Sequence, residues 1–135
     1  MLGNQGVITL MSVKAADFVL YIVSDVGKAV PFYRDVLGLK LAVFKPEWQW
    51  AEFDIGNVTL CLFGENPGAP MRAGKGGVAV AFGVENFEDA VARLTENGHT
   101  PIFGPNEGST CREPIFLDPD GNPFLVHKRH DETNG

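Results

Sequence analysis

The chain has 135 residues, of which 44% are hydrophobic and 21% charged, a composition typical of a globular protein rather than a disordered one. Its formal net charge of −6 argues against nucleic-acid binding, which needs a basic surface to neutralise phosphates. No apolar run is long enough to cross a bilayer and the N-terminus has no secretion-signal pattern, so we expect a cytoplasmic protein with no membrane partner.

The first half of the chain predicts a strand, a helix and three further strands. An N-terminal extension, 1–15, precedes this first module, 16–65. Its strands are expected at 18–23, 40–45, 48–54 and 58–63, in runs that contain many β-branched and aromatic residues. Asp25 can cap the helix, which ends at Gly38, and Pro31 predicts a late start or a bend in its first turn.

The second half repeats this order. A linker rich in Gly and Pro, 66–76, leads to the second module, 77–129, which is followed by a polar tail, 130–135. Strands are expected at 77–84, 100–103, 110–117 and 123–128, with a helix between Asn86 as its N-cap and a stop at Asn97-Gly98. The fold class is therefore α+β: two βαβββ modules in tandem, forming a curved mixed sheet or half-barrel around a ligand-binding cleft.

Three segments, "YIVSDVGKAVPFYRDVLGLKL" (21–41), "FGVENFEDAVARLTENG" (82–98) and "FLDPDGNPFLVH" (116–127), resemble the vicinal oxygen chelate superfamily. This family groups glyoxalase I, extradiol dioxygenases, fosfomycin-resistance proteins and bleomycin-resistance proteins. The resemblance implies the paired-module fold, a cleft for a small molecule and a homodimer.

The resemblance also indicates where metal ligands would stand, on the first and last strands of each module. In this chain those positions hold Phe18, Cys61, Ala79 and Leu125. None is a usual ligand for Mg, Mn, Ni or Fe. The sequence thus looks most like the metal-free bleomycin-resistance branch, and we expect no metal, no cofactor and no catalytic residue. The two cysteines, Cys61 and Cys111, lack zinc spacing and are expected to be free buried thiols.

Several side chains are candidates for ligand binding. Trp48, Trp50 and Glu52 alternate on one predicted strand and would share a face that suits a planar or cationic ligand. The other candidates are Cys61, Phe63, Arg112 and His127. Each also has a simpler interpretation, because the tryptophans can pack in a core or dimer interface, Arg112 can be a surface residue, and His127 can be a hydrogen-bonded strand histidine.

The predicted function is metal-independent binding of a small molecule, such as a drug or antibiotic. One alternative is a metal-dependent lyase or dioxygenase with displaced ligands, which requires His127, Glu52, Cys61 or Glu113 to converge on one point. Another is a non-catalytic structural or regulatory dimer whose cleft is filled by large apolar side chains.

Overall fold

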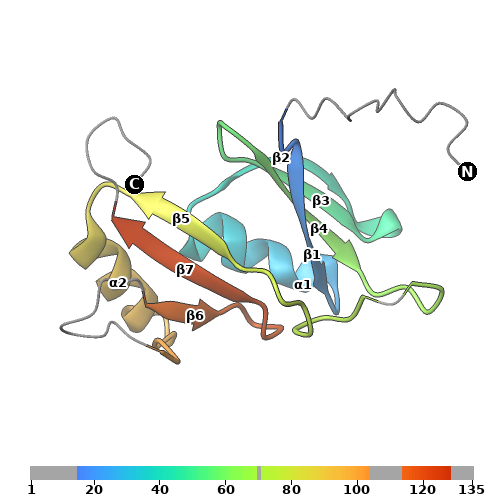
Figure 1. The fold of residues 1–135 in the computed structure, drawn as a ribbon. Coiled ribbons are helices and arrows are strands. Elements are labelled where there is room, and N and C mark those ends of the chain that lie inside the picture. Colours follow the sequence, from blue (N-terminus) through green and yellow to red (C-terminus); the bar gives the residue numbers. More distant parts are fainter. Residues whose placement is uncertain (1–14, 70, 104–113, 129–135) are drawn as a thin grey trace, which may run out of the picture.

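The protein has an α+β fold with two mixed sheets, as the sequence predicts (Figure 1). The computed structural model describes residues 15–69, 71–103 and 114–128. Within these ranges no helix is both long enough and apolar enough to span a membrane.

The first half of the chain contains β1 (Phe18–Val23), α1 (Val26–Pro31), a π-helical turn η1 (Phe32–Val36), β2 (Lys40–Lys45), a 3-10 turn η2 (Pro46–Trp48), β3 (Trp50–Asp54) and β4 (Thr59–Gly64). The strand order is β1-β4-β3-β2, with β1 parallel to β4. Asp25 caps α1 by accepting a 2.9 Å hydrogen bond from the Gly27 N–H, as predicted. The helix does not start late; its winding changes at Pro31, which cannot donate a backbone hydrogen bond.

The second half contains β5 (Val80–Val84), α2 (Phe87–Glu96), β6 (Ile115–Leu117) and β7 (Pro123–Lys128). Its sheet order is β5-β7-β6, with β5 parallel to β7. Asn86 caps α2 as predicted, through a 3.0 Å hydrogen bond from the Asp89 N–H. The strand expected at 100–103 is reduced to an isolated bridge between Phe103 and Ile115, and only the end of the strand expected at 110–117 lies within the described residues.

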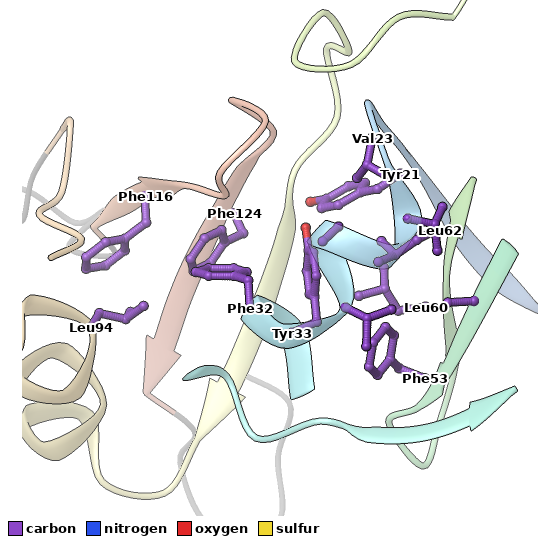
Figure 2. Close-up of a cluster of buried hydrophobic side chains, with 14 of the residues drawn as sticks. Tyr21, Val23, Phe32, Tyr33, Phe53, Leu60, Leu62, Leu94, Phe116 and Phe124 are labelled. Atoms are coloured by element: carbon purple, nitrogen blue, oxygen red, sulfur yellow. The ribbon is translucent and has the colours of Figure 1, made fainter. Parts of the chain in front are cut away.

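One hydrophobic core joins the two sheets, and α1 with η1 lies between them (Figure 2). Tyr33 packs against Phe53 of the first sheet, with ring centroids 5.8 Å apart. On the other side, Phe32 packs against Phe124 of the second sheet, also at 5.8 Å. Each sheet therefore buries one face in this shared core, and its other face points away from the core. The outward face of the first sheet is called the open face below.

Buried and partly buried hydrogen bonds also connect the halves, so the core is not held by apolar contact alone. The Tyr21 hydroxyl donates to the Pro123 carbonyl at 2.7 Å and accepts from the Val80 N–H at 2.8 Å. The Asn122 side-chain amide donates to the Ile22 carbonyl at 2.9 Å. These contacts fix β1 against the start of β5 and β7, and thereby orient one sheet relative to the other.

Candidate functional site

Strand pairing arranges the open face in two rows. In the first row, Leu20 of β1 lies opposite Cys61 of β4, which lies opposite Glu52 of β3. In the second row, Ile22, Phe63 and Trp50 follow the same order. Their chain neighbours on these strands, such as Leu60, Leu62, Ala51 and Phe53, belong to the buried core. Since side chains alternate along a strand, these six residues share the outward side of the sheet.

The indole of Trp50 is fixed on the open face by two contacts. Its Nε1–H donates a 2.8 Å hydrogen bond to Oε2 of Glu52. Its ring meets Phe63 edge to face, with centroids 5.6 Å apart and an interplanar angle of 68°. The prediction that Trp50 and Glu52 lie on one face of a strand is therefore confirmed.

The same prediction is wrong for Trp48, which lies outside the strand. Trp48 ends η2, and Gln49 follows in the left-handed region with φ 52° before β3 begins at Trp50. The side-chain oxygen of Gln49 accepts a 2.9 Å hydrogen bond from the Val26 N–H, which ties this turn to the start of α1. Trp48 is 66% exposed, and Lys45 Nζ lies 5.4 Å from its ring centroid. Trp48 and Trp50 therefore do not share one face of a strand.

The thiol of Cys61 is free, as predicted, and only 2% exposed, in the middle of the first row. Burial raises its pKa, and the charge of Glu52 on the neighbouring strand raises it further. A thiol whose pKa is raised carries little thiolate near neutral pH and is a poor nucleophile. Cys61 therefore suits contact with a ligand better than covalent chemistry.

Of the other predicted site residues, His127 does not lie in these two rows. Arg112, with its neighbours Cys111 and Glu113, lies outside the described residues. His127 belongs to β7, opposite Gly83, and lines a cavity that contains none of the six open-face residues. The structure thus brings together Trp50, Glu52, Cys61 and Phe63.

Three of the four positions at which the resemblance implies metal ligands carry side chains that do not fit a metal, and the fourth is Cys61. Phe18 begins β1 and is 56% exposed, Leu125 lies on β7, and Ala79 directly precedes β5. Carbon side chains cannot ligate a metal. Over 15–69, 71–103 and 114–128, no group of three His, Cys, Asp or Glu residues could hold a metal ion.

Sequence reasoning missed a cavity of about 340 Å³ between β1 and the linker. It is lined by Leu20 and Ile22 on one side and by Met71, Arg72 and Lys75 on the other. Because side chains alternate along a strand, the positions of Leu20 and Ile22 on the same face as Phe18 could have been predicted from the sequence. A glycine-rich linker has no such periodicity, so nothing in the pattern identifies Arg72 or Lys75.

A sequence profile of the Glyoxalase/Bleomycin resistance protein/Dioxygenase superfamily matches residues 15–126. The chain belongs to this superfamily. Among its relatives, a metallothiol transferase FosB of Staphylococcus saprophyticus is 29% identical over 118 residues, which cover 85% of this chain and 77% of the relative.

Solved structures of the superfamily fold are also similar. TnmS3, an antibiotic binding protein from Streptomyces sp. CB03234, matches with a TM-score of 0.71 and 25% identity, over 88% of this chain and 98% of TnmS3. A superfamily member from Sphaerobacter thermophilus matches with a TM-score of 0.70 and 23% identity, over 88% of this chain and all (100%) of that one, which supports the fold alone.

Proposed function

We propose that this protein binds a small molecule on its open face without a metal. The observation that carries the proposal is the second row, where the indole of Trp50 is fixed by Glu52 and Phe63 rather than buried in the core. The carbon side chains at three of the four ligand positions that the resemblance implies, Phe18, Ala79 and Leu125, favour binding over metal chemistry. The similarity to TnmS3, which is described as an antibiotic binding protein, supports a drug or antibiotic as the ligand class.

The part of the open face that holds Trp50 and Glu52 favours a planar ligand that carries a positive charge, whereas Arg72 and Lys75 line the cavity beside Leu20 and Ile22 at the β1 edge. Leu20, Ile22 and Phe63 supply apolar contact, and Trp50 supplies an aromatic ring. Oε2 of Glu52 is occupied by Trp50, while its Oε1 has no hydrogen bond to any described residue. That oxygen is therefore available to a cationic group beside the indole.

A homodimer is part of the proposal. The two sheets bury one face each in the core around α1, so their outward faces point away from that core. A cleft that encloses a ligand between two such faces is then completed by a second chain. Sedimentation of the purified protein tests this, and a monomer at micromolar concentration would contradict it.

Tryptophan fluorescence tests the ligand. The Trp48→Phe variant leaves Trp50 as the only indole, and Trp50→Phe is the matched control that leaves Trp48. Proflavine, a planar cation, should quench the first variant saturably and the second only weakly, and Glu52→Gln should weaken binding about tenfold. Equal binding of anthracenecarboxylate, a planar anion, or equal quenching of both variants would overturn the proposal.

A second candidate function is metal-dependent transfer, because the FosB relatives are named metallothiol transferases. The described residues do not fit a metal, so this function would need ligands from elsewhere in the chain. Mass spectrometry of protein purified without an affinity tag, before and after incubation with Mn, Ni, Zn and Fe(II), distinguishes the two. A stoichiometric metal, together with loss of proflavine binding in EDTA, would favour the transferase.

A further inference from the structure

The shared core is incomplete at one end. A cavity of about 510 Å³ lies between the end of η1 and the β3–β4 turn on one side and β5, β7 and α2 on the other. Its volume falls in the range of small-molecule sites, roughly 300 to 1,000 Å³. The cavity lies on the core side of both sheets and contains none of the six open-face residues, so it is distinct from the site proposed above.

The walls of this cavity are mostly aliphatic and aromatic. Leu39 and Ile55 come from the first half of the chain, and Phe82, Ala90 and Leu94 from the second. All but Leu94 are only partly buried, although they pack against the core. Their uncovered surface is what an apolar ligand would remove from water, at roughly 25 cal/mol per Å².

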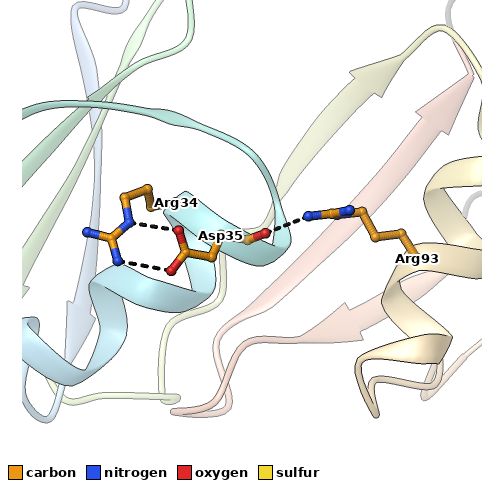
Figure 3. A network of polar contacts seen from close by, with 3 residues as sticks. All are labelled: Arg34, Asp35 and Arg93. Atoms are coloured by element: carbon orange, nitrogen blue, oxygen red, sulfur yellow. Dashed lines mark hydrogen bonds and ion pairs between the residues drawn. The ribbon is translucent and has the colours of Figure 1, made fainter.

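One cation, Arg93, lines this cavity. Figure 3 shows its side chain pointing from α2 toward Asp35. Its guanidinium reaches from α2 to the end of η1, where Nε donates to the Val36 carbonyl at 2.8 Å and Nη2 to the Asp35 carbonyl at 2.6 Å. The carboxylate of Asp35 is already paired with Arg34, through two hydrogen bonds of 2.8 and 2.9 Å. Among the described residues, no carboxylate therefore neutralises Arg93.

The geometry of Arg93 leaves donors for a ligand. A guanidinium has five N–H groups, and the two carbonyls use one on Nε and one on Nη2. Three N–H groups remain, one on Nη2 and two on Nη1, so the Nη1–Nη2 edge can still offer a carboxylate two parallel hydrogen bonds. Among the residues that line the cavity there is no Asp or Glu to repel an anion.

We propose that this cavity binds an amphipathic monocarboxylate, whose apolar chain fills the cavity and whose carboxylate pairs with Arg93. The two walls belong to different halves of the chain, so the ligand also bridges them. Bound ligand should therefore stabilise the folded protein, by an amount that grows with the logarithm of the ligand concentration above its Kd.

Isothermal titration with decanoate tests the proposal, with decyltrimethylammonium as the probe of equal chain and opposite charge. Decanoate should bind the full chain with a rise in melting temperature, and the cation should bind at least about tenfold more weakly. Arg93→Gln should lose about tenfold in decanoate affinity, and Arg93→Lys should lose less, because it keeps the charge but not the parallel hydrogen bonds of the guanidinium. The matched control is Arg72→Gln, because Arg72 is exposed and lines the separate cavity of about 340 Å³ rather than this one. It should bind decanoate as the wild type does.

A second variant keeps the test informative if Arg93 is needed for folding. Ala90→Leu adds three carbons inside the cavity and should abolish decanoate binding without touching the charge. Trp50→Phe should leave decanoate binding unchanged, which separates this site from the open face. Equal affinity for both probes, unchanged binding in Arg93→Gln, or no binding to the wild type would overturn the proposal. The proposal would also be overturned if the Ala90→Leu variant changed its oligomeric state and decanoate did not bind. That result would mean that a second chain, and not a small ligand, covers the cavity.

Discussion

The hydroxyl of Tyr33, in the π-helical turn η1, donates a 2.6 Å hydrogen bond to the buried carboxylate of Asp118, 85 residues later in the chain. Asp118 is 4% exposed and stands at the start of the turn before β7. Its other oxygen accepts from the backbone N–H groups of Asp120 and Asn122, at 2.9 and 2.7 Å. One carboxylate thus shapes the turn and joins the two halves.

Removal of this carboxylate should destabilise the whole protein. In Asp118→Ala, the Tyr33 hydroxyl and two backbone N–H groups lose their acceptor inside the protein. We expect a loss of about 3 kcal/mol or more in the free energy of unfolding, measured by urea denaturation. Asp120→Ala is the control, because Asp120 accepts only an exposed hydrogen bond from the Ser24 N–H and should cost less than about 1 kcal/mol. Equal losses in the two variants would refute the central role of Asp118.

The two tyrosines should make the folded protein lose stability at alkaline pH. Burial raises the pKa of Tyr21 to about 12, and Asp118 adds to this while a hydrogen bond from Val80 opposes it. Burial also raises the pKa of Tyr33 far above its usual value, with further contributions from the charge of Asp118 and the hydrogen bond to it. Unfolded tyrosines lose their protons near pH ~10. The unfolded state then binds fewer protons than the folded one, so stability falls as the pH rises from about 10 through 12.

Ultraviolet absorbance of tyrosinate measures this directly, because Tyr21 and Tyr33 are the only tyrosines of the chain. We expect no tyrosinate signal at about pH 10.5 while the protein is folded, and a full signal once urea unfolds it. The Tyr21→Phe variant should lose stability less steeply with rising pH. A gradual tyrosinate signal in the folded protein near pH ~10 would show that these hydroxyls are not protected.

The pattern of apolar residues predicts strands better than it predicts turns. Alternation gives the bounds of β2 and β7, because one face of β7 is buried and one face of β2 is less exposed than the other. It fails at Trp48, since the left-handed turn at Gln49 depends on a hydrogen bond to Val26, 23 residues away. It also overstates the strand at 100–103, where Pro101 has no N–H to contribute to a ladder.

For the candidate binding sites, too, the sequence predicts one part and misses another. The open-face pairing of Trp50 with Glu52 follows from the period of a strand and is visible in the sequence. The cavity that contains Arg93 is not, because its walls come from residues about 57 positions apart in the chain, whose approach is set by the shared core. A lone arginine on an amphipathic helix has no feature that separates it from a surface residue.

The start of β3 depends on the absence of a side chain at Gly64. A Cβ there would lie 2.8 Å from Oε1 and 2.9 Å from Cβ of Gln49, closer than Cβ atoms in proteins approach other heavy atoms. Gly64→Ala should therefore displace Gln49 and cost roughly 1–3 kcal/mol in the free energy of unfolding. It should also shift the fluorescence of Trp50 in a Trp48→Phe background. Gly76→Ala is the matched control, since a Cβ at Gly76 meets nothing within 4 Å, and a comparable loss there would refute the explanation.

The reactivity of Cys61 reports directly on the open face. In a Cys111→Ser background it is the only thiol of the chain. Because Cys61 is 2% exposed and its pKa is raised by burial and by Glu52, its reaction with Ellman's reagent should be far slower in the folded protein than in urea. Glu52→Gln removes one cause of the raised pKa, so the reaction at about pH 8 should become faster, and the gain should shrink as the pH rises. A planar cation bound beside Trp50 should slow the same reaction further. Fast modification of the folded wild type would instead mean that the first row is open to solvent and that Cys61 is a candidate nucleophile.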